Sequence, residues 1–507
     1  MNRWLKLNFP GMFLKMKFIN ELKTKQISEI MNLYKLLNKV LSAGIIIFSV
    51  SSAAIPQSKT YTLDDAINTA LSNNRDIKVA ELNVKKSKDA VDEAFGYALP
   101  SLDLSASFNH FLKKPKTPFP DFEALLTNAT YSILFDENVI PRDESKYKPI
   151  ATQLQSFVQT NSYETSLLLT QTLFNSAVFR GIGASQIYLD LSKEELKRKI
   201  SSTILDVKKA FYGVLLTKQL LEITTASYNN ALENLKNVKA LNAQGLVSDY
   251  DAMQAEVRVE NIKPVVLQIE NNLKDVKNSF KIVIGVNQQE EVDVEGEFLY
   301  SKEEIPEITG TIEKAMESNY SISSLKLKMR VDEAFIDLDR SEYWPSLYAF
   351  GNYTYAGSSD NFKFQNYSST VVGLTLSINL FNGERTKNKV QQSEISLKQS
   401  GEQLLQLKDY ISTQVKAKIY ELNRVKSSLD AQERNVGLAE KAYDISIVRY
   451  KEGTGNQLEV QNADMELKQA RINRLQTIYD YIIAKSGLDE ILGNIDPEYM
   501  DTMNIEE

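Results

Sequence analysis

The chain has 507 residues, of which 43% are apolar, and a formal net charge of −7 at pH 7. It contains no cysteine, which excludes disulfides, thiolate metal sites, cysteine nucleophiles and a lipid-modified N-terminal cysteine. His110 is the sole histidine, so acid–base chemistry would have to use carboxylates, which are also the commonest solvating groups. We therefore expect no catalytic residue, no cofactor and no metal site.

The first 54 residues differ from the rest of the chain in charge, with eight Lys or Arg and two Glu. The apolar run Val40–Val50 follows Lys35 and Lys39 and precedes the small residues 51–54. This is the three-part pattern of a secretory signal peptide. A transmembrane anchor is the alternative, but a membrane span needs about 20 apolar residues and this run is shorter.

Met31 begins a segment that is complete as a signal peptide. We therefore expect residues 31–54 to be the signal peptide and residues 1–30 to be an upstream extension from a misassigned start. Without residues 1–54 the chain keeps 51 basic and 64 acidic residues, a net charge of −13. Such a chain is poorly suited to bind nucleic acid.

The remaining chain contains one unit twice. Ala98–Leu102 recurs as Tyr343–Leu347 at an offset of 245, and Leu173–Asn175 recurs as Leu380–Asn382 at an offset of 207. We expect both copies to run helix, strand, loop, strand, very long helix, glycine turn and long helix. The expected segments are repeat 1 at 55–285, an acidic crossover at 286–310, repeat 2 at 311–493 and an acidic tail at 494–507.

The change in offset gives the first copy 38 extra residues, which fit between His110 and Ser162. Prolines interrupt this stretch and disfavour regular structure. We therefore expect a long loop that lies outside the cell. The five prolines are Pro115, Pro118, Pro120, Pro141 and Pro149.

Four runs alternate apolar and polar residues, at about 100–112, 162–174, 345–357 and 370–381. This alternation is typical of lipid-facing barrel strands, which need about 9–11 residues to cross a membrane at a tilt. A soluble half-buried sheet is the alternative for any single run. Four strands cannot close a barrel, for which about eight are needed, so we expect the chain to oligomerise. In the fourth run the apolar positions are Leu374, Leu376, Ile378 and Leu380.

Long stretches with few glycines predict helices at about 176–243, 248–284, 382–451 and 456–491. At ~1.5 Å per residue, the first would reach on the order of 100 Å. Pro264 predicts a bend in the second, because a mid-helix proline removes a hydrogen bond. A cytosolic coiled coil would also explain apolar stripes, but not the signal pattern, the strands or the repeat. The stripes, at three-and-four spacing, are Ile200, Ile204, Val207, Phe211 and Val214, and Leu404, Leu407, Ile411, Val415, Ile419, Leu422 and Leu429.

In this order of elements, Tyr61–Gly493 resembles the TolC-like outer membrane efflux protein family. The paired Pro-Ser-Leu strand starts and the turns Ala243–Ser248 and Tyr450–Gly455 carry the resemblance. It implies an α+β membrane protein, in which a homotrimer closes one twelve-stranded outer-membrane β-barrel that continues into a long α-helical periplasmic tunnel.

The resemblance also implies a function and partners. The protein would be the outer-membrane channel of a tripartite efflux or type I secretion system, a passive duct in contact with outer-membrane lipid. An inner-membrane pump of the RND or ABC type would drive it through a periplasmic adaptor (membrane fusion) protein. The adaptor would dock on the helix-tip turns, which are Gly245, Leu246, Val247, Ser248, Gly453, Thr454 and Gly455.

Asp251 and Glu459 lie six residues after Gly245 and Gly453, at equivalent places in the two repeats. The resemblance implies that such carboxylates narrow the periplasmic aperture and favour cations. Ordinary helix-start acids, favoured by the helix dipole, are the alternative.

The candidate aperture also includes Tyr450, Asn462 and Asp464. Tyr450 matches a tyrosine that helps hold the family's closed state. Asn462 stands where the family has a second carboxylate, and Gly455 stands where it has an arginine. The latch is therefore looser than in the family, or Asp464 substitutes for the missing carboxylate.

Two other classes of function are alternatives to the duct. An exported structural or adhesive coiled coil, anchored in the outer membrane by its strands, would share the helices but conduct no ions. An enzyme could use paired carboxylates, as glycoside hydrolases do, but no segment is expected to form a pocket for them. The sequence does not identify the transported substrate, because a passive duct takes its cargo from its pump.

Overall fold

The computed structural model describes residues 59–298, 300, 304–496 and 499. The described residues fall into two units. Lys59 and Thr60 with Gln289–Asp293 belong to a small unit, in which the Lys59 N–H donates to the Glu291 carbonyl (3.0 Å). All other described residues form the large unit. The predicted upstream extension and signal peptide, and most of the acidic tail, lie outside the described residues.

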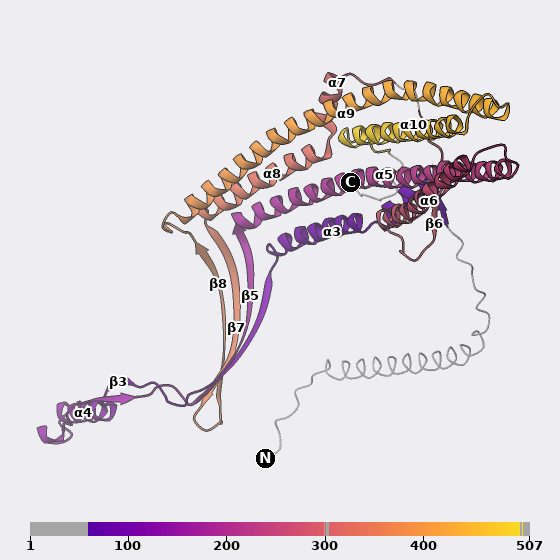
Figure 1. Ribbon diagram of the computed structural model, residues 1–507. Coiled ribbons are helices and arrows are strands. Elements are labelled where there is room, and N and C mark those ends of the chain that lie inside the picture. Colours follow the sequence, from indigo (N-terminus) through magenta and orange to yellow (C-terminus); the bar gives the residue numbers. More distant parts are fainter. Residues whose placement is uncertain (1–58, 299, 301–303, 497–498, 500–507) are drawn as a thin grey trace, which may run out of the picture. The chain divides into compact units, whose positions relative to one another are not determined.

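The elements follow one another in two similar series (Figure 1). The first series is β1 (Lys59–Tyr61), α2 (Leu63–Asn73), α3 (Arg75–Gly96), β2 (Ser101–His110), β3 (Thr117–Pro120), α4 (Phe122–Asp136), η1 (Glu144–Lys146), β4 (Thr152–Gln155), β5 (Asn161–Asn175), α5 (Ser176–Ala243) and α6 (Asp249–Ile284). The second series is β6 (Val292–Val294), α7 (Ile308–Ser318), α8 (Tyr320–Arg340), η2 (Ser341–Tyr343), β7 (Ser346–Ser359), β8 (Gln365–Ser377), α9 (Arg385–Lys451) and α10 (Gln457–Ile491).

Each series has two helices before its first long strand, where the sequence had predicted one. The break falls at Asn74 in the first series and at Asn319 in the second, and each asparagine caps the helix that follows. The Asn74 Oδ1 accepts from the N–H of Asp76 (2.9 Å), and the Asn319 Oδ1 from that of Ser321 (2.9 Å). Asparagine favours this position because its side chain satisfies N–H groups that have no partner within the helix.

The main sheet has four antiparallel strands in the order β2-β5-β7-β8. The register places Ser101 near the end of β5, and Ser346 opposite both Asn175 and Ser377. The junctions with α3, α5, α8 and α9 therefore all lie at one end of the sheet, and Figure 1 shows the four strands leading into these helices. The outer strands β2 and β8 each keep one edge without a partner strand in the described chain.

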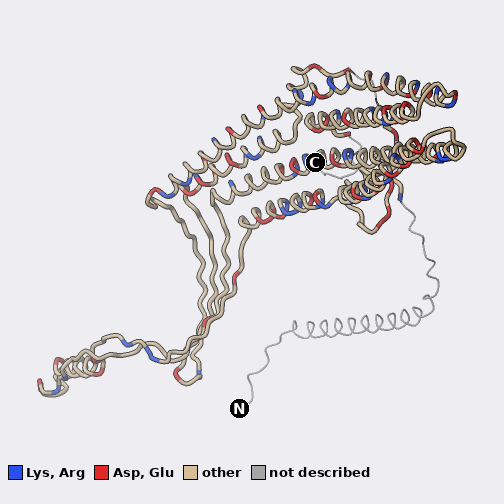
Figure 2. Tube along the Cα trace, in the orientation of Figure 1, with Lys and Arg blue, Asp and Glu red and all other residues tan. Residues whose placement is uncertain are grey.

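The two faces of this sheet differ in polarity. The four strands of this sheet contain only two charged residues, Asp103 and Glu164, and they appear almost free of charge in Figure 2. Both lie on the same face, together with Ser105, Ser166 and Asn352, and the Ser166 hydroxyl donates to the Asn352 Oδ1 (2.6 Å). This face also carries the apolar Leu168 and Val371. The opposite face carries Leu102, Leu104, Leu167, Leu169, Tyr353, Val372, Leu374 and Leu376, all of them exposed.

The inserted segment between β2 and β5 corrects the prediction of an unstructured loop. It folds as a β3–β4 hairpin with α4 between the two strands. Pro118 and Pro120 lie within β3, which is possible because a two-stranded sheet leaves each strand with an open edge that needs no N–H. Asp121 then caps α4 by accepting from the N–H groups of Glu123 (3.0 Å) and Ala124 (3.1 Å). The prolines of this segment therefore do not prevent regular structure.

The fourth strand ends earlier than its apolar alternation predicts. β8 stops at Ser377, and Ile378 and Leu380 lie in an irregular segment in which Leu380 is 87% exposed. The pairing explains the difference, because Ser377 faces Ser346, the first residue of β7, and the backbone beyond it has no strand to pair with. The helix that follows begins at Arg385, after a turn in which Gly383 and Glu384 have positive φ.

The helices pack as two antiparallel pairs, α5 with α6 and α9 with α10, and α8 packs against both α5 and α9. The stripe on α5 from Ile200 to Val214 is buried, and so are Ile411, Val415, Ile419 and Leu422 of α9. The α9 residues join Tyr481 and Leu488 of α10 in a common core. Pro264 lies within α6, whose helical hydrogen bonding continues past it, and the bend at this site stays a prediction.

Candidate functional site at the helix-pair turns

A glycine in the left-handed conformation forms each turn between paired helices. Gly245 has φ +74° and Gly453 has φ +71°, values that glycine adopts without a Cβ clash. The Leu246 N–H donates to the Leu241 carbonyl (3.0 Å), and the Thr454 N–H donates to the Arg449 carbonyl (2.9 Å). Each bond satisfies a carbonyl of the last helical turn, so both chains reverse direction within a few residues.

Asp251 is the third residue of α6 and takes part in a capping box. Its carboxylate accepts from the Ser248 hydroxyl (2.7 Å) and the Ser248 N–H (3.2 Å), while the Ser248 hydroxyl accepts from the Asp251 N–H (3.2 Å). This is the arrangement of an ordinary helix-start acid. A role in an aperture would come in addition to this cap.

Glu459 occupies the same position in α10 but has a further partner. Its N–H donates to the side chain of Asn456 (2.9 Å), which caps the helix. Its carboxylate also lies 3.1 Å from the Arg449 guanidinium, near the end of α9. Arg449 thus reaches the turn from the preceding helix and pairs with the carboxylate at its far side. Gly455 leaves room for it, because an added Cβ would lie 3.1 Å from that of Arg449.

Asp464 forms a largely buried ion pair with Arg258. The guanidinium of Arg258, on α6, donates to the Asp464 carboxylate at 2.6 Å, with 15% and 14% of the two side-chain surfaces exposed. The Ser227 hydroxyl of α5 donates to the same oxygen of Asp464 (3.0 Å). This cluster joins both helices of the first pair to α10 of the second.

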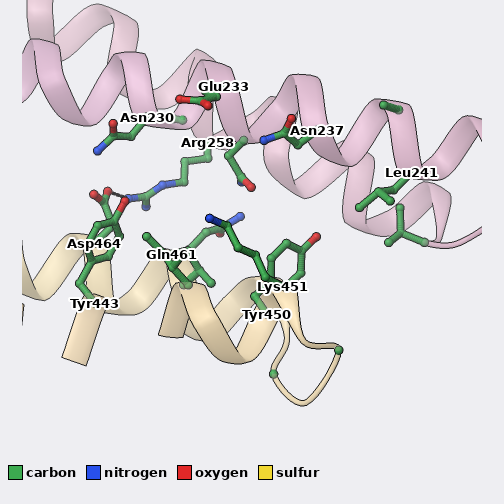
Figure 3. A pocket seen from close by; sticks show the side chains of 18 of the residues that line it. Asn230, Glu233, Asn237, Leu241, Arg258, Tyr443, Tyr450, Lys451, Gln461 and Asp464 are labelled. Carbon is green, nitrogen blue, oxygen red and sulfur yellow. Dashed lines mark hydrogen bonds and ion pairs between the residues drawn. The ribbon is translucent and has the colours of Figure 1, made fainter. Parts of the chain in front are cut away.

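Tyr450 and Asp464 line a cavity of ≈ 820 Å³ between the two helix pairs. Figure 3 shows Arg258 reaching across it to Asp464, with Tyr450 and Lys451 on the same side as Asp464. Burial raises the pKa of the Tyr450 phenol, and the Asp251 carboxylate raises it further. The phenol therefore stays neutral and able to donate a hydrogen bond at physiological pH.

The structure brings together part of the residue set predicted from the sequence. The cavity is lined by Leu246, Val247, Tyr450, Gly453, Gly455 and Asp464 from that set. Asp251, Glu459 and Asn462 do not line it. Sequence reasoning missed Arg258, Arg449 and Ser227. For Arg449 a signal existed, since it lies one residue before Tyr450. Arg258 stands 206 residues from Asp464 and carried no local signal.

No group of three or more His, Asp or Glu side chains in the described ranges is arranged to hold a metal ion. No described helix combines the length and the apolar content that crossing a membrane requires.

The chain is similar in sequence to known outer-membrane proteins. Residues 311–494 match the family described as outer membrane efflux protein. The chain is 22% identical to outer membrane protein TolC of Salmonella enteritidis over 68% of this chain and 72% of that protein. It is 21% identical to the alkaline protease secretion protein AprF of Pseudomonas aeruginosa over 66% of this chain and 70% of that protein.

The fold is that of known outer-membrane channels. The crystal structure of the Campylobacter jejuni CmeC outer membrane channel superimposes with a TM-score of 0.68 at 15% identity, covering 87% of this chain and 90% of that one. The chain therefore carries an outer membrane efflux protein domain in its second repeat, is homologous to TolC, and shares the fold of outer-membrane channels.

Proposed function

We propose that this protein is the outer-membrane channel of a tripartite efflux or type I secretion system, a passive duct whose energy comes from an inner-membrane pump. One observation carries the proposal: a sheet with one strongly apolar face, and with both of its charged side chains on the other face, leads at a single end into helices of up to 68 residues. An exposed apolar face suits lipid, and a polar face suits a water-filled lumen. The family relationship supports an outer-membrane location with helices in the periplasm.

The protein acts as a homotrimer in this proposal. A sheet with open edges is not tolerated in lipid, because its backbone groups would lack hydrogen-bond partners. β2 and β8 run antiparallel to each other, so β8 of one copy can pair with β2 of the next without breaking the alternation. Three copies give about twelve strands, enough to enclose a channel.

The turns form the periplasmic aperture and the docking site for an adaptor protein in the same proposal. Asp251 and Glu459 of three copies bring six carboxylates to a narrow mouth, where their field favours cations. Tyr450 contributes to the closed state, and the Arg258–Asp464 pair takes over the linking role of the carboxylate that Asn462 lacks. A channel protein of this kind needs no catalytic residues, and we assign none.

Planar-bilayer recordings test this function. The purified protein should conduct, with a reversal potential in a salt gradient that shows preference for cations. The Asp251→Asn, Glu459→Gln variant should lose most of that preference, because the charged ring is neutralised. Glu466→Gln is the matched control, since Glu466 is an exposed carboxylate of α10 that lies further from the turn than Glu459, and it should leave the reversal potential unchanged.

Two results would count against the proposal. A purified protein that inserts but conducts no ions would favour a structural or adhesive role. An unchanged reversal potential in the double variant would leave the duct in place but remove Asp251 and Glu459 from its aperture.

A further inference from the structure

The helix of the inserted segment, α4, is held on one face only. On this face Ala124 and Phe135 are buried, at 1% and 5% exposure. The Asn128 side chain fixes the helix to the segment after η1, since it donates to the Lys148 carbonyl (2.8 Å) and accepts from the Lys148 N–H (2.7 Å). Phe135 also contacts Tyr147 edge-on, with ring centroids 5.9 Å apart. The helix thus has a fixed orientation within the insertion.

The opposite face of α4 carries an exposed apolar seam. Phe122, Leu126, Ala129 and Ile133 follow one another at spacings of four, three and four residues, which places them in one line along the helix. Phe122 and Leu126 are each 54% exposed, Ile133 is 63% exposed, and Ala129 is exposed as well. This seam, residues 122, 126, 129 and 133, is the pattern by which helices pack on one another.

The insertion is anchored to the sheet end that lies away from the long helices. Asp360, in the turn between β7 and β8, accepts from Lys114 and from the N–H (2.8 Å) and hydroxyl (2.7 Å) of Thr160. Lys114 precedes the β3–β4 hairpin and Thr160 follows it, so one carboxylate holds both ends of the insertion. The two ends of the segment that carries α4 are therefore tied to the sheet.

We propose that the seam of α4 packs against the same seam of the neighbouring copies, forming a helical bundle at the outer mouth of the duct. The inference rests on the proposed trimer, which brings three insertions to the same end of one closed sheet. The charge of α4 favours a second copy, and not a lipid surface, as the partner of the seam. α4 contains no Lys or Arg and carries Glu123 and Asp136, whereas helices that lie on anionic lipid are rich in basic residues.

The bundle gives the channel an outer constriction of its own, separate from the periplasmic aperture. Burial of leucine and isoleucine side chains at a/d-type positions is the main source of stability in such bundles, and the small Ala129 allows close approach of the helix axes.

Cysteine cross-linking of the otherwise cysteine-free chain tests the proposal. Leu126→Cys and Ala129→Cys, made singly, place a thiol on the seam. Lys146→Cys is the control, because Lys146 is exposed on η1 and off the seam. After oxidation, each seam variant should run largely as a disulfide-linked dimer. About two thirds of the chains should become cross-linked, because two of the three cysteines in a trimer can form a disulfide and the third stays reduced. The control should stay monomeric in denaturing gels.

The mass of each sample in detergent, from light scattering, separates this inference from the proposed function. A trimer in which seam and control variants cross-link equally little would overturn the bundle and leave the duct intact. A monomer would contradict both. Ala129→Cys changes little volume, so loss of folding in the Leu126 variant would still leave a usable test.

Discussion

Asp360 shows how much one side chain can organise in this protein. It accepts from both ends of the insertion, and the Lys114 and Thr160 contacts lower its pKa from 3.8 to about 2. Because the folded pKa is lowered, these contacts stabilise the structure at pH values above about 4 and are lost as the pH falls through about 2. The clamp is therefore expected to hold throughout the physiological range.

Removing this carboxylate should release the insertion without affecting the sheet. In Asp360→Asn, limited proteolysis at pH 7 should cut residues 111–160 faster than in the wild type, while the long helices stay intact. Glu144→Gln is the control, because the Arg142–Glu144 pair is local to the insertion and exposed at both ends. Equal cleavage rates in Asp360→Asn and the wild type would show that the clamp does not order the insertion.

At the helix-pair turns, the sequence predicted residues that occupy equivalent positions in the two repeats. It did not predict the ion pairs that form between different helices. Gly245 and Gly453, and Asp251 and Glu459, could be found because a repeat places equal functions at equal positions. Arg258 could not, because 59 basic residues are spread along the chain and nothing local marks the one that faces Asp464. Gly455 likewise gave no sign of the ion pair that Arg449 and Glu459 form across the same turn.

At the scale of elements, the long helices were the most predictable part. The predicted helix at 176–243 has the observed bounds of α5, because a continuous three-and-four stripe runs between a cap at Asn175 and a left-handed glycine at Gly245. The insertion was wrongly predicted to be a loop, because prolines destabilise a two-stranded sheet little when their missing N–H groups lie at an open edge. The end of β8 was mispredicted because alternation continues in the sequence beyond the point where a partner strand exists.

The Arg258–Asp464 pair links the two helix pairs, and its removal should loosen them locally. Asp464→Ala would leave a largely buried guanidinium without its partner, which costs about 3–5 kcal/mol. Hydrogen exchange should report a loss of protection near that size in α6 and α10 around these residues. Glu440→Ala is the control, because the Glu440–Arg471 pair is exposed, and surface pairs contribute about 0–1 kcal/mol. Similar losses in both variants would mean that the buried pair is no stronger a link than a surface one.

At the scale of the whole molecule, the repeat seen in the sequence extends to tertiary contacts. The Asn74 side chain donates to the Val283 carbonyl (2.7 Å), and Asn319 donates to the Ile491 carbonyl (2.8 Å). Gly285 and Gly493 end the last helix of each repeat with positive φ, and a Cβ on either would lie within 2.5 Å of a carbonyl oxygen of the facing segment. The same joint is thus built twice, once in each repeat.

The assembly could be inferred from the sequence only indirectly. The alternation of apolar and polar residues and the number of strands imply that four strands need further partners in a membrane. Which strands pair between copies depends on which two strands lie at the open edges of the sheet, and the sequence does not give this. The structure defines those edges as β2 and β8 and shows that their directions allow continuous antiparallel pairing between copies.

The most direct test of this account is a cryo-electron microscopy reconstruction of the purified protein in a lipid nanodisc. The account predicts a threefold-symmetric particle in which β8 of each copy pairs with β2 of the next, the Leu102 and Leu374 face turns to lipid, and the Asp103 and Glu164 face turns to the lumen. A particle in which the edges of β2 and β8 stay unpaired, or in which the charged face meets lipid, would contradict it.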